Sequence, residues 1–145
     1  MILPADLRDL RAVRELEKIC FGADAWFWLE VALALAAPNV RLKAVHAGRV
    51  VGLVIGEAVP FTNYAWIATL GVHPDFQRRG IGSGLLAEAE ARLKRPVMKK
   101  TVRESNGPAR ALYEKFGYDA VERQAQYYSG GEAGIVMEKR RSYTS

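Results

Sequence analysis

Apolar side chains recur at helical spacing near the start of the chain. After Asp6, a favourable N-cap residue, an apolar position at every third or fourth residue predicts a first helix reaching Cys20. A second helix is expected from about Ala25 to Ala36, because Pro38 cannot continue it.

The spacing then changes to the alternation typical of strands. Two alternating segments, 40–46 and 50–58, flank a short turn and predict a hairpin. The remaining expected elements are a strand at 65–72, a helix at 83–94, a strand at 97–102, a helix at 109–116, and a closing hairpin of 121–128 with 133–138. This order predicts one α/β domain with a mixed sheet over residues 1–145, with 140–145 as a frayed tail.

Composition narrows the class of protein. The chain has 145 residues, half of them hydrophobic and 26% charged, which is typical of a globular domain with a real core. A net charge of +5 suits an anionic ligand, but the positive side chains are scattered, so nucleic-acid binding is not expected as the main function. The single cysteine, Cys20, lies on an apolar helix face and is interpreted as a packing residue.

No segment of the sequence predicts export or insertion into a membrane. The longest apolar run, 31–37, is far too short to cross a bilayer, and no signal peptide is expected. The protein is therefore expected to be cytoplasmic, with no membrane partner. No set of side chains predicts a metal site, and His46 and His73 are the two histidines of the chain.

The segment between the strand at 65–72 and the helix at 83–94 reads Gln77-Arg78-Arg79-Gly80-Ile81-Gly82. A glycine-containing loop that opens a helix directs main-chain N–H groups toward one point, and such a point binds phosphate. The spacing excludes a Walker loop, which needs a lysine after Gly82, and a dinucleotide fingerprint, which needs glycine where Leu85 stands. A plain turn with two solvated arginines remains the alternative.

In this setting the hexapeptide resembles the acetyl-CoA pyrophosphate loop of the GNAT N-acetyltransferase superfamily. Three further segments carry the resemblance, namely 102–106 (VRESN), 111–118 (ALYEKFGY) and 127–132 (YYSGGE). Together they are similar to the N-terminal acetyltransferases, and within them to the ribosomal-protein-alanine (RimI-type) branch. The resemblance implies a mixed sheet of six to seven strands flanked by about four helices, with acetyl-CoA as cosubstrate.

The resemblance also implies where the cosubstrate binds. The pyrophosphate would be held by the main chain of Arg78, Arg79, Gly80, Ile81, Gly82 and Ser83. The pantetheine arm would pair with the main chain of Leu70, Gly71 and Val72, where this strand splays from the strand at 97–102. The N–H of Leu70 or Val72 would polarise the thioester carbonyl. Alternatively, the side chains of Leu70 and Val72 are simply core.

Two residues match family positions near the reacting atoms. Asn106 would contact the cosubstrate near its reactive end, and Tyr113 would be the general acid that protonates the departing sulfur. From the residues alone, Asn106 is equally an N-cap and Tyr113 a helix tyrosine packed on the sheet.

The general base is where this chain departs from the resemblance. Thr101 stands where RimI-type enzymes have a glutamate, and Trp66 stands at a second base position used by some relatives. Neither side chain accepts a proton at neutral pH. Glu57, His73 and Glu104 remain as candidates that would act through water.

These observations predict an acetyl-CoA-dependent enzyme that acetylates the α-amino group of protein or peptide N-termini, with a ribosomal protein as a possible acceptor. Phe21, Trp26, Tyr127 and Tyr128 are the predicted walls of the acceptor groove. Phe21 and Trp26 could equally be ordinary packing between the first two helices. The alternatives are an enzyme for a small-molecule amine and a CoA-binding protein with weak catalysis.

Overall fold

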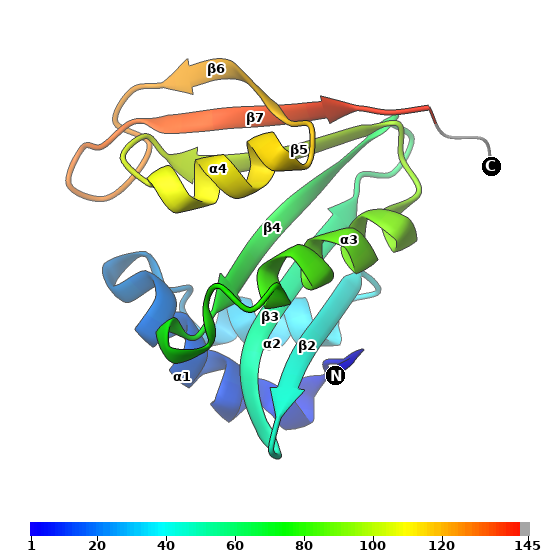
Figure 1. Ribbon diagram of the computed structural model, residues 1–145, viewed down its shortest axis with the longest axis vertical. Coiled ribbons are helices and arrows are strands. Elements are labelled where there is room, and N and C mark those ends of the chain that lie inside the picture. Colours follow the sequence, from blue (N-terminus) through cyan, green and yellow to red (C-terminus); the bar gives the residue numbers. More distant parts are fainter. Residues whose placement is uncertain (143–145) are drawn as a thin grey trace. The chain divides into compact units, whose positions relative to one another are not determined.

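A computed structural model describes residues 1–142 of the chain (Figure 1). Its strands are β1 (Ile2–Pro4), β2 (Val40–His46), β3 (Arg49–Ala58), β4 (Tyr64–Val72), β5 (Val97–Arg103), β6 (Asp119–Gln124) and β7 (Gly134–Arg140). Its α-helices are α1 (Leu10–Phe21), α2 (Trp28–Ala36), α3 (Ile81–Leu93) and α4 (Gly107–Lys115). The strand order is β1-β2-β3-β4-β5-β7-β6, with β4 parallel to β5 and antiparallel pairs elsewhere in the registers that are defined. The prediction of a mixed α/β sheet is confirmed.

Several predicted boundaries need correction. Strand β1 was missed because it has only three residues, and its pairing with β2 (Ile2 with Ala44) is remote in sequence. Helix α2 begins at Trp28, later than expected, because Phe27 is still extended and its N–H donates to the Glu30 carboxylate at 3.2 Å. Strand β6 ends at Gln124, so the two tyrosines expected at the end of this strand lie in a loop.

The expected frayed tail also needs correction where the structure describes it. Arg140 is the last residue of β7, and the N–H of Arg141 donates to the carbonyl of Pro96 at 2.8 Å. Residues 143–145 of the predicted tail lie outside the described residues. Within residues 1–142, no helix is both long and apolar enough to cross a membrane.

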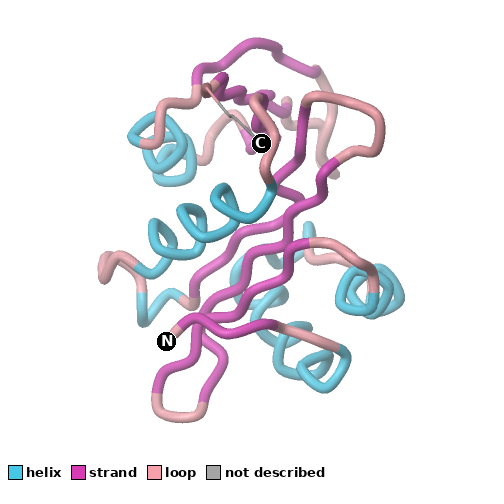
Figure 2. The backbone as a smooth tube through the Cα atoms, turned by 90° about the vertical axis from the view of Figure 1, so that its right-hand side faces the viewer, coloured by secondary structure: helices cyan, strands magenta, loops and turns pink. Residues whose placement is uncertain are grey.

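The chain divides into two compact units, Met1–Glu57 with Ile67–Leu93, and Ala58–Trp66 with Lys94–Ser145. In the first unit, β3 is buried on both faces. Leu53 and Ile55 join the core cluster of α1 and α2, whereas the intervening Gly52 and Gly56 face α3. A Cβ on Gly56 would lie 2.7 Å from Leu93 Cδ1, so the missing side chain lets α3 approach the strand closely. Figure 2 shows helices on both sides of these strands.

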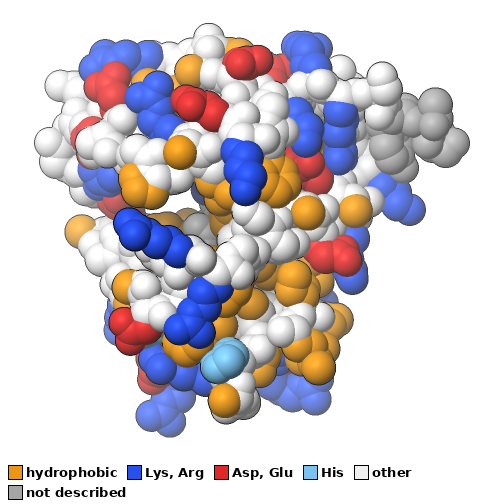
Figure 3. All heavy atoms as spheres, in the orientation of Figure 1, with side chains coloured by type: hydrophobic (Ala, Val, Ile, Leu, Met, Phe, Trp, Pro, Cys, Tyr) orange, Lys and Arg blue, Asp and Glu red, His pale blue; other side chains and the backbone are white. Residues whose placement is uncertain are grey.

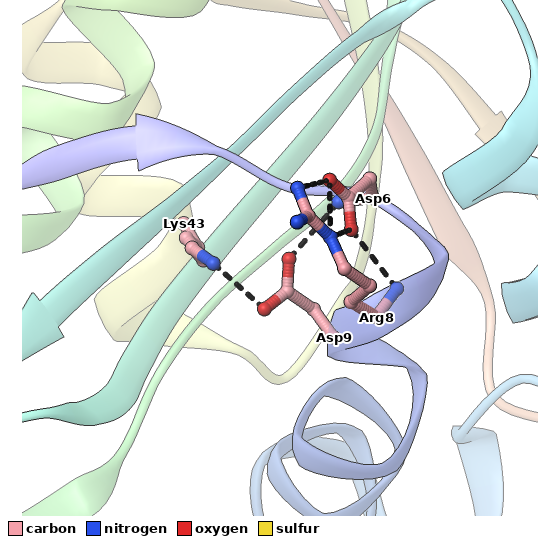
Figure 4. Close-up of polar contacts among 4 residues, drawn as sticks. All are labelled: Asp6, Arg8, Asp9 and Lys43. Atoms are coloured by element: carbon pink, nitrogen blue, oxygen red, sulfur yellow. Dashed lines mark hydrogen bonds and ion pairs between the residues drawn. The ribbon is translucent and has the colours of Figure 1, made fainter.

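The start of α1 is fixed by the polar cluster in Figure 4. Asp6 caps a 3-10 turn at Leu7–Asp9 that leads into α1, which confirms its expected capping role. Its carboxylate accepts from the N–H and guanidinium of Arg8, and these bonds lower the pKa of Asp6 to about 2. Asp9 closes the capping box and accepts from Lys43 Nζ at 2.7 Å, which ties the turn to β2.

In the second unit, the first three residues of β4 pair with β5. Strand β5 also pairs with β7, and β7 pairs with β6. The parallel register joins Tyr64–Trp66 to Val97–Lys99. Helix α4 follows β5, and its Tyr113 ring packs edge-on against Tyr118 at a centroid distance of 5.2 Å. Gly117, between helix and strand, has φ +93°, the left-handed conformation expected at a helix C-terminus.

Candidate active site

The predicted site residues fall in both units. The first holds Phe21, Trp26, Leu70, Gly71, Val72, Arg78, Arg79, Gly80, Ile81, Gly82 and Ser83, and the second holds Asn106, Tyr113, Tyr127 and Tyr128.

The glycine loop has the geometry of an anion-binding helix start. Arg78 and Gly80 have φ of +63° and +79°, and α3 begins immediately afterwards at Ile81. The first helical bond runs from the N–H of Gly84 to the carbonyl of Gly80 at 2.9 Å. The N–H groups of Ile81–Ser83 therefore have no carbonyl four residues back within the helix. A Cβ on Gly80 would meet no atom within 4 Å, so a phosphate can approach this main chain.

The segment before the loop is held by its own side chains. Gln77 Nε2 donates to the carbonyl of Val72 at 3.2 Å, and the Arg79 guanidinium lies 5.0 Å from the centre of the Phe76 ring. His73 Nδ1 accepts from the N–H of Asp75, while its Nε2 lies 3.0 Å from Arg49 Nη2. Both ring nitrogens of His73 are thus engaged, and His73 is a turn residue in the structure.

The end of β4 lies beyond its register with β5 and carries a close contact with α1. A Cβ on Gly71 would meet Phe21 Cζ at 3.1 Å and Cys20 Sγ at 3.2 Å. The structure therefore places the predicted groove residue Phe21 directly against the predicted pantetheine strand. Leu70 and Val72 are only half-buried, so neither is an ordinary core residue.

A buried polar pair that the sequence analysis missed lies beside this contact. The Glu17 side chain is 3% exposed, and the hydroxyl of Thr69 on β4 donates to its Oε1 at 3.1 Å. Both residues line a narrow recess together with Phe21 and Gly71. The apolar stripe of α1 passes through position 17, so a charged residue within that stripe was the signal available in the sequence.

Cys20 is a packing residue in the structure, and it lies within this apolar neighbourhood. Burial is the main cause that raises the pKa of its thiol to about 11, and the charge of Glu17 adds to the effect. The thiol therefore stays protonated at neutral pH, which agrees with its interpretation as a packing residue and not a nucleophile.

Trp26 is half-buried and packs against the core cluster of the first unit. This contact is the ordinary packing that the sequence left open as an alternative to a groove wall. The contact with Gly71 at the strand end of β4 is made by Phe21.

In the second unit, the two residues expected near the reacting atoms are the N-cap of α4, Asn106, and Tyr113 within the helix. The Asn106 side chain accepts from the N–H of Ala109 at 3.1 Å, so it is an N-cap, as the residues alone suggested. Tyr113 is 2% exposed and packs on Tyr118, so it is buried.

Neither family position for a base holds a proton acceptor. Thr101 and Trp66 are both half-buried, and Lys99 Nζ lies 5.6 Å from the centre of a Trp66 ring. Glu104 accepts from Arg123 Nε at 2.7 Å, and this bond, with a coulombic contribution from the same arginine, lowers the pKa of Glu104. A carboxylate with a lowered pKa is a weaker base, which argues against Glu104 in that role.

A second feature missed from the sequence surrounds the two tyrosines of the β6–β7 loop. Glu132 Oε1 accepts from Arg103 Nη1, and its Oε2 accepts from the N–H of Ser105, each at 2.7 Å. The Arg103 guanidinium lies 4.6 Å from the centre of the Tyr128 ring. These partners are far apart in sequence, so no local pattern identified them.

On the face drawn in Figure 3, lysine and arginine side chains lie among acidic and hydrophobic ones. Within the glycine loop itself, positive charge comes from Arg78 and Arg79. The residues of this loop fit a nucleotide diphosphate, because they combine open space, directed donors and positive charge.

Comparison with known proteins identifies the family to which the chain belongs. Residues 10–118 match the model of the Acetyltransferase (GNAT) family. The chain is 35% identical to N-alpha-acetyltransferase RimI of Mycobacterium tuberculosis over 140 residues, covering 92% of this chain and 87% of that protein. It is 36% identical to Acetyltransferase ECA0875 of Pectobacterium atrosepticum over 88 residues, covering 59% of this chain and 61% of that relative.

A solved structure has the same fold. The crystal structure of the ribosomal-protein-S18-alanine N-acetyltransferase from Escherichia coli superposes with a TM-score of 0.88 at 25% identity, covering 100% of this chain and 96% of that chain. A family model that spans most of the sequence and a relative matched nearly from end to end leave one conclusion. The chain belongs to the GNAT family of acetyltransferases and is an acetyl-CoA-dependent N-acetyltransferase.

Proposed function

We propose that this enzyme acetylates the α-amino group of protein or peptide N-termini by direct attack of the amine on the thioester of acetyl-CoA. The proposal extends to a ribosomal protein as acceptor and to a cytoplasmic location. Two similar proteins, N-alpha-acetyltransferase RimI and the ribosomal-protein-S18-alanine N-acetyltransferase, have names of this activity class.

The observation that carries the proposal is that Thr101 and Trp66 occupy the two base positions. An α-amino group with a pKa of about 7.8 loses its proton at pH 7 at a cost of roughly 1 kcal/mol, whereas a lysine at about 10.4 costs roughly 4.6 kcal/mol. An α-amine can therefore react with water as the proton acceptor. A lysine side chain would need a dedicated base.

The proposed roles of the residues follow from the family resemblance and from the geometry within each unit. The N–H groups of Arg78–Ser83 hold the pyrophosphate, and the main chain of Leu70–Val72 binds the pantetheine arm and polarises the thioester carbonyl. Asn106 contacts the cosubstrate near its reactive end. The new bond joins the amine nitrogen to the acetyl carbon as the carbon–sulfur bond breaks, and the amine's proton passes to water.

Tyr113 is the general acid of this proposal. The thiol formed from the departing thiolate has a pKa near 8.5, and the phenol of a tyrosine has a pKa near 10. A proton transfer from tyrosine to sulfur is therefore close to balanced. Because Tyr113 is 2% exposed and packed on Tyr118, this role requires the packing around its hydroxyl to open.

The residues proposed to contact the acceptor chain are Phe21 and Trp26 in the first unit and Tyr127 and Tyr128 in the second. Phe21 supports this placement because it contacts Gly71, a residue of the pantetheine strand. Tyr127 supports it because 52% of its surface is exposed, as a contact residue for a peptide requires.

The test is a comparison of acceptors by release of free thiol from acetyl-CoA. Peptides with a free N-terminus and one internal lysine should be acetylated, and the same peptides with a blocked N-terminus should not. The rate should rise with pH through the titration of the α-amine. Faster turnover of free amino acids or amino sugars would favour a small-molecule acceptor, and CoA binding without turnover would favour a binding protein.

A further inference from the structure

The β6–β7 loop, residues 125–133, is fastened through a single carboxylate. Glu132 accepts two hydrogen bonds of 2.7 Å, from the Arg103 guanidinium and from the main-chain N–H of Ser105. Both donors belong to the segment where β5 ends. Two short bonds on one carboxylate, one of them to a cation, are strong enough to hold a loop in one conformation.

The arginine that binds Glu132 also covers one of the two tyrosines. Its guanidinium lies 4.6 Å from the centre of the Tyr128 ring, and its Nη2 lies 3.4 Å from the carbonyl oxygen of Ser129. A planar guanidinium can bind a carboxylate at its edge and an aromatic ring with its face. Arg103 thus couples the Glu132 carboxylate to the orientation of Tyr128.

Two further hydrogen bonds, one from its main chain and one from its hydroxyl, hold Tyr128 in place. Its N–H donates to the carbonyl of Glu132 at 3.1 Å, and its hydroxyl donates to the carbonyl of Thr101 at 3.3 Å. The ring is therefore held at both ends, by the loop that carries it and by the strand beside it.

Tyr127 packs on this arrangement and remains exposed. Its ring meets that of Tyr128 edge-on at 4.8 Å, and 52% of the residue is exposed. A Cβ on Gly134 would lie 2.9 Å from Tyr127 Cγ and 3.0 Å from Thr101 Cγ2. The missing side chain at Gly134 makes room for Tyr127 next to Thr101.

We propose that Glu132 is a positioning residue that, through Arg103, holds Tyr127 and Tyr128 as a preordered surface for the first residues of the acceptor peptide. This rests on the proposed function. A surface that is ordered before binding spares the acceptor the free-energy cost of ordering two aromatic side chains and their loop. Tyrosine suits this role because its large contact area has few rotatable bonds.

The first test replaces Glu132 by alanine and compares it with Glu122→Ala, an exposed carboxylate on β6 outside the network. The two variants lose the same charge from the same unit. Glu132→Ala should raise the KM for the peptide acceptor by about tenfold, from the added cost of ordering the loop. The KM for acetyl-CoA and kcat should stay within about twofold of the unchanged enzyme, since Glu132 touches neither in this proposal. A Glu132→Ala enzyme that is only less heat-stable, with unchanged acceptor KM, overturns the proposal.

A double-mutant cycle tests whether Glu132 acts through the tyrosines. In a Tyr128→Ala background, Glu132→Ala should raise the acceptor KM much less than in the native background, because the side chain that it positions is gone. Equal effects in both backgrounds overturn the coupling. Glu132→Gln, which retains an oxygen for the Ser105 N–H, should recover part of the acceptor affinity.

Hydrogen exchange gives a readout that does not need the acceptor. Main-chain amides of residues 125–133 should exchange faster in Glu132→Ala than in Glu122→Ala, and equal rates overturn the proposal. If the unchanged enzyme acetylates only small amines, the proposed function fails separately, and the KM of the same variants is then measured for the amine that reacts. A raised KM for that amine supports the positioning role, and an unchanged KM refutes it.

Discussion

Replacement of Gly80 by alanine tests the phosphate-binding loop against a matched control in the same unit. Gly80 and Gly48 have nearly equal φ, +79° and +76°, and a Cβ on either would meet no atom within 4 Å. An L-residue in this left-handed region costs roughly 1 to 2 kcal/mol. Reduced freedom of the unfolded chain offsets about 0.4 to 1 kcal/mol of that cost. The two variants should therefore lose the same small amount of stability, a few degrees in Tm.

Binding of CoA should separate the two variants. In Gly80→Ala the methyl group enters the space that a phosphate needs, and at least one N–H bond to the phosphate is lost. A hydrogen bond to a charged group contributes about 1.5 to 3 kcal/mol, which is roughly a 10- to 150-fold rise in Kd. Gly48→Ala lies in the β2–β3 turn and should bind CoA like the unchanged protein. Titration calorimetry with CoA measures both, and equal Kd values would falsify the assignment of the loop.

Three further outcomes are expected. Tyr113→Phe should lower kcat by about 100-fold or more with CoA affinity unchanged, and full turnover would contradict its role as general acid. Thr69→Val removes the hydroxyl that donates to Glu17 and should lower the free energy of unfolding by about 1 to 3 kcal/mol, measured by urea unfolding. An unchanged urea midpoint would contradict this. The pKa values of Glu132 and Asp6 are lowered to about 2 from 4.5 and 3.8, chiefly by bonds to Ser105 and Arg103 and to Arg8. The stability that these two carboxylates contribute is therefore fully present above the pKa values of the unfolded chain, and it is lost as the pH falls toward 2. Urea unfolding at stepped pH should show the difference in free energy of unfolding between the unchanged protein and Glu132→Gln shrinking as the pH falls from 4.5 toward 2.

The parts of the site that the sequence predicted are those set by local chemistry. The segment Gln77–Gly82 follows an apolar strand and opens an amphipathic helix, and both patterns are legible within a few residues. Asn106 as an N-cap is equally local, because its partner Ala109 is three residues away.

The parts that were missed depend on pairing between distant segments. Glu132 meets Arg103 because the β5–β7 register sets Arg103 opposite Gly134, and a sequence pattern does not fix that register. Glu17 meets Thr69 across 52 positions, where α1 packs on β4. Each polar group satisfies its partner across a tertiary contact, and the choice of partner is visible only in the fold.

The close approach of α3 to β3 has a consequence for substitutions far from the glycine loop. The proposed pyrophosphate loop precedes Ile81 at the start of α3, whereas Leu93 at the other end, roughly 20 Å away at 1.5 Å per residue, fills the space left by Gly56. A methyl group at position 56 would overlap Leu93 Cδ1, the end of a flexible side chain, so the Leu93 side chain has to move before the helix does. Position 56 therefore controls how the far end of α3 is seated on the strand, without a change to the loop itself.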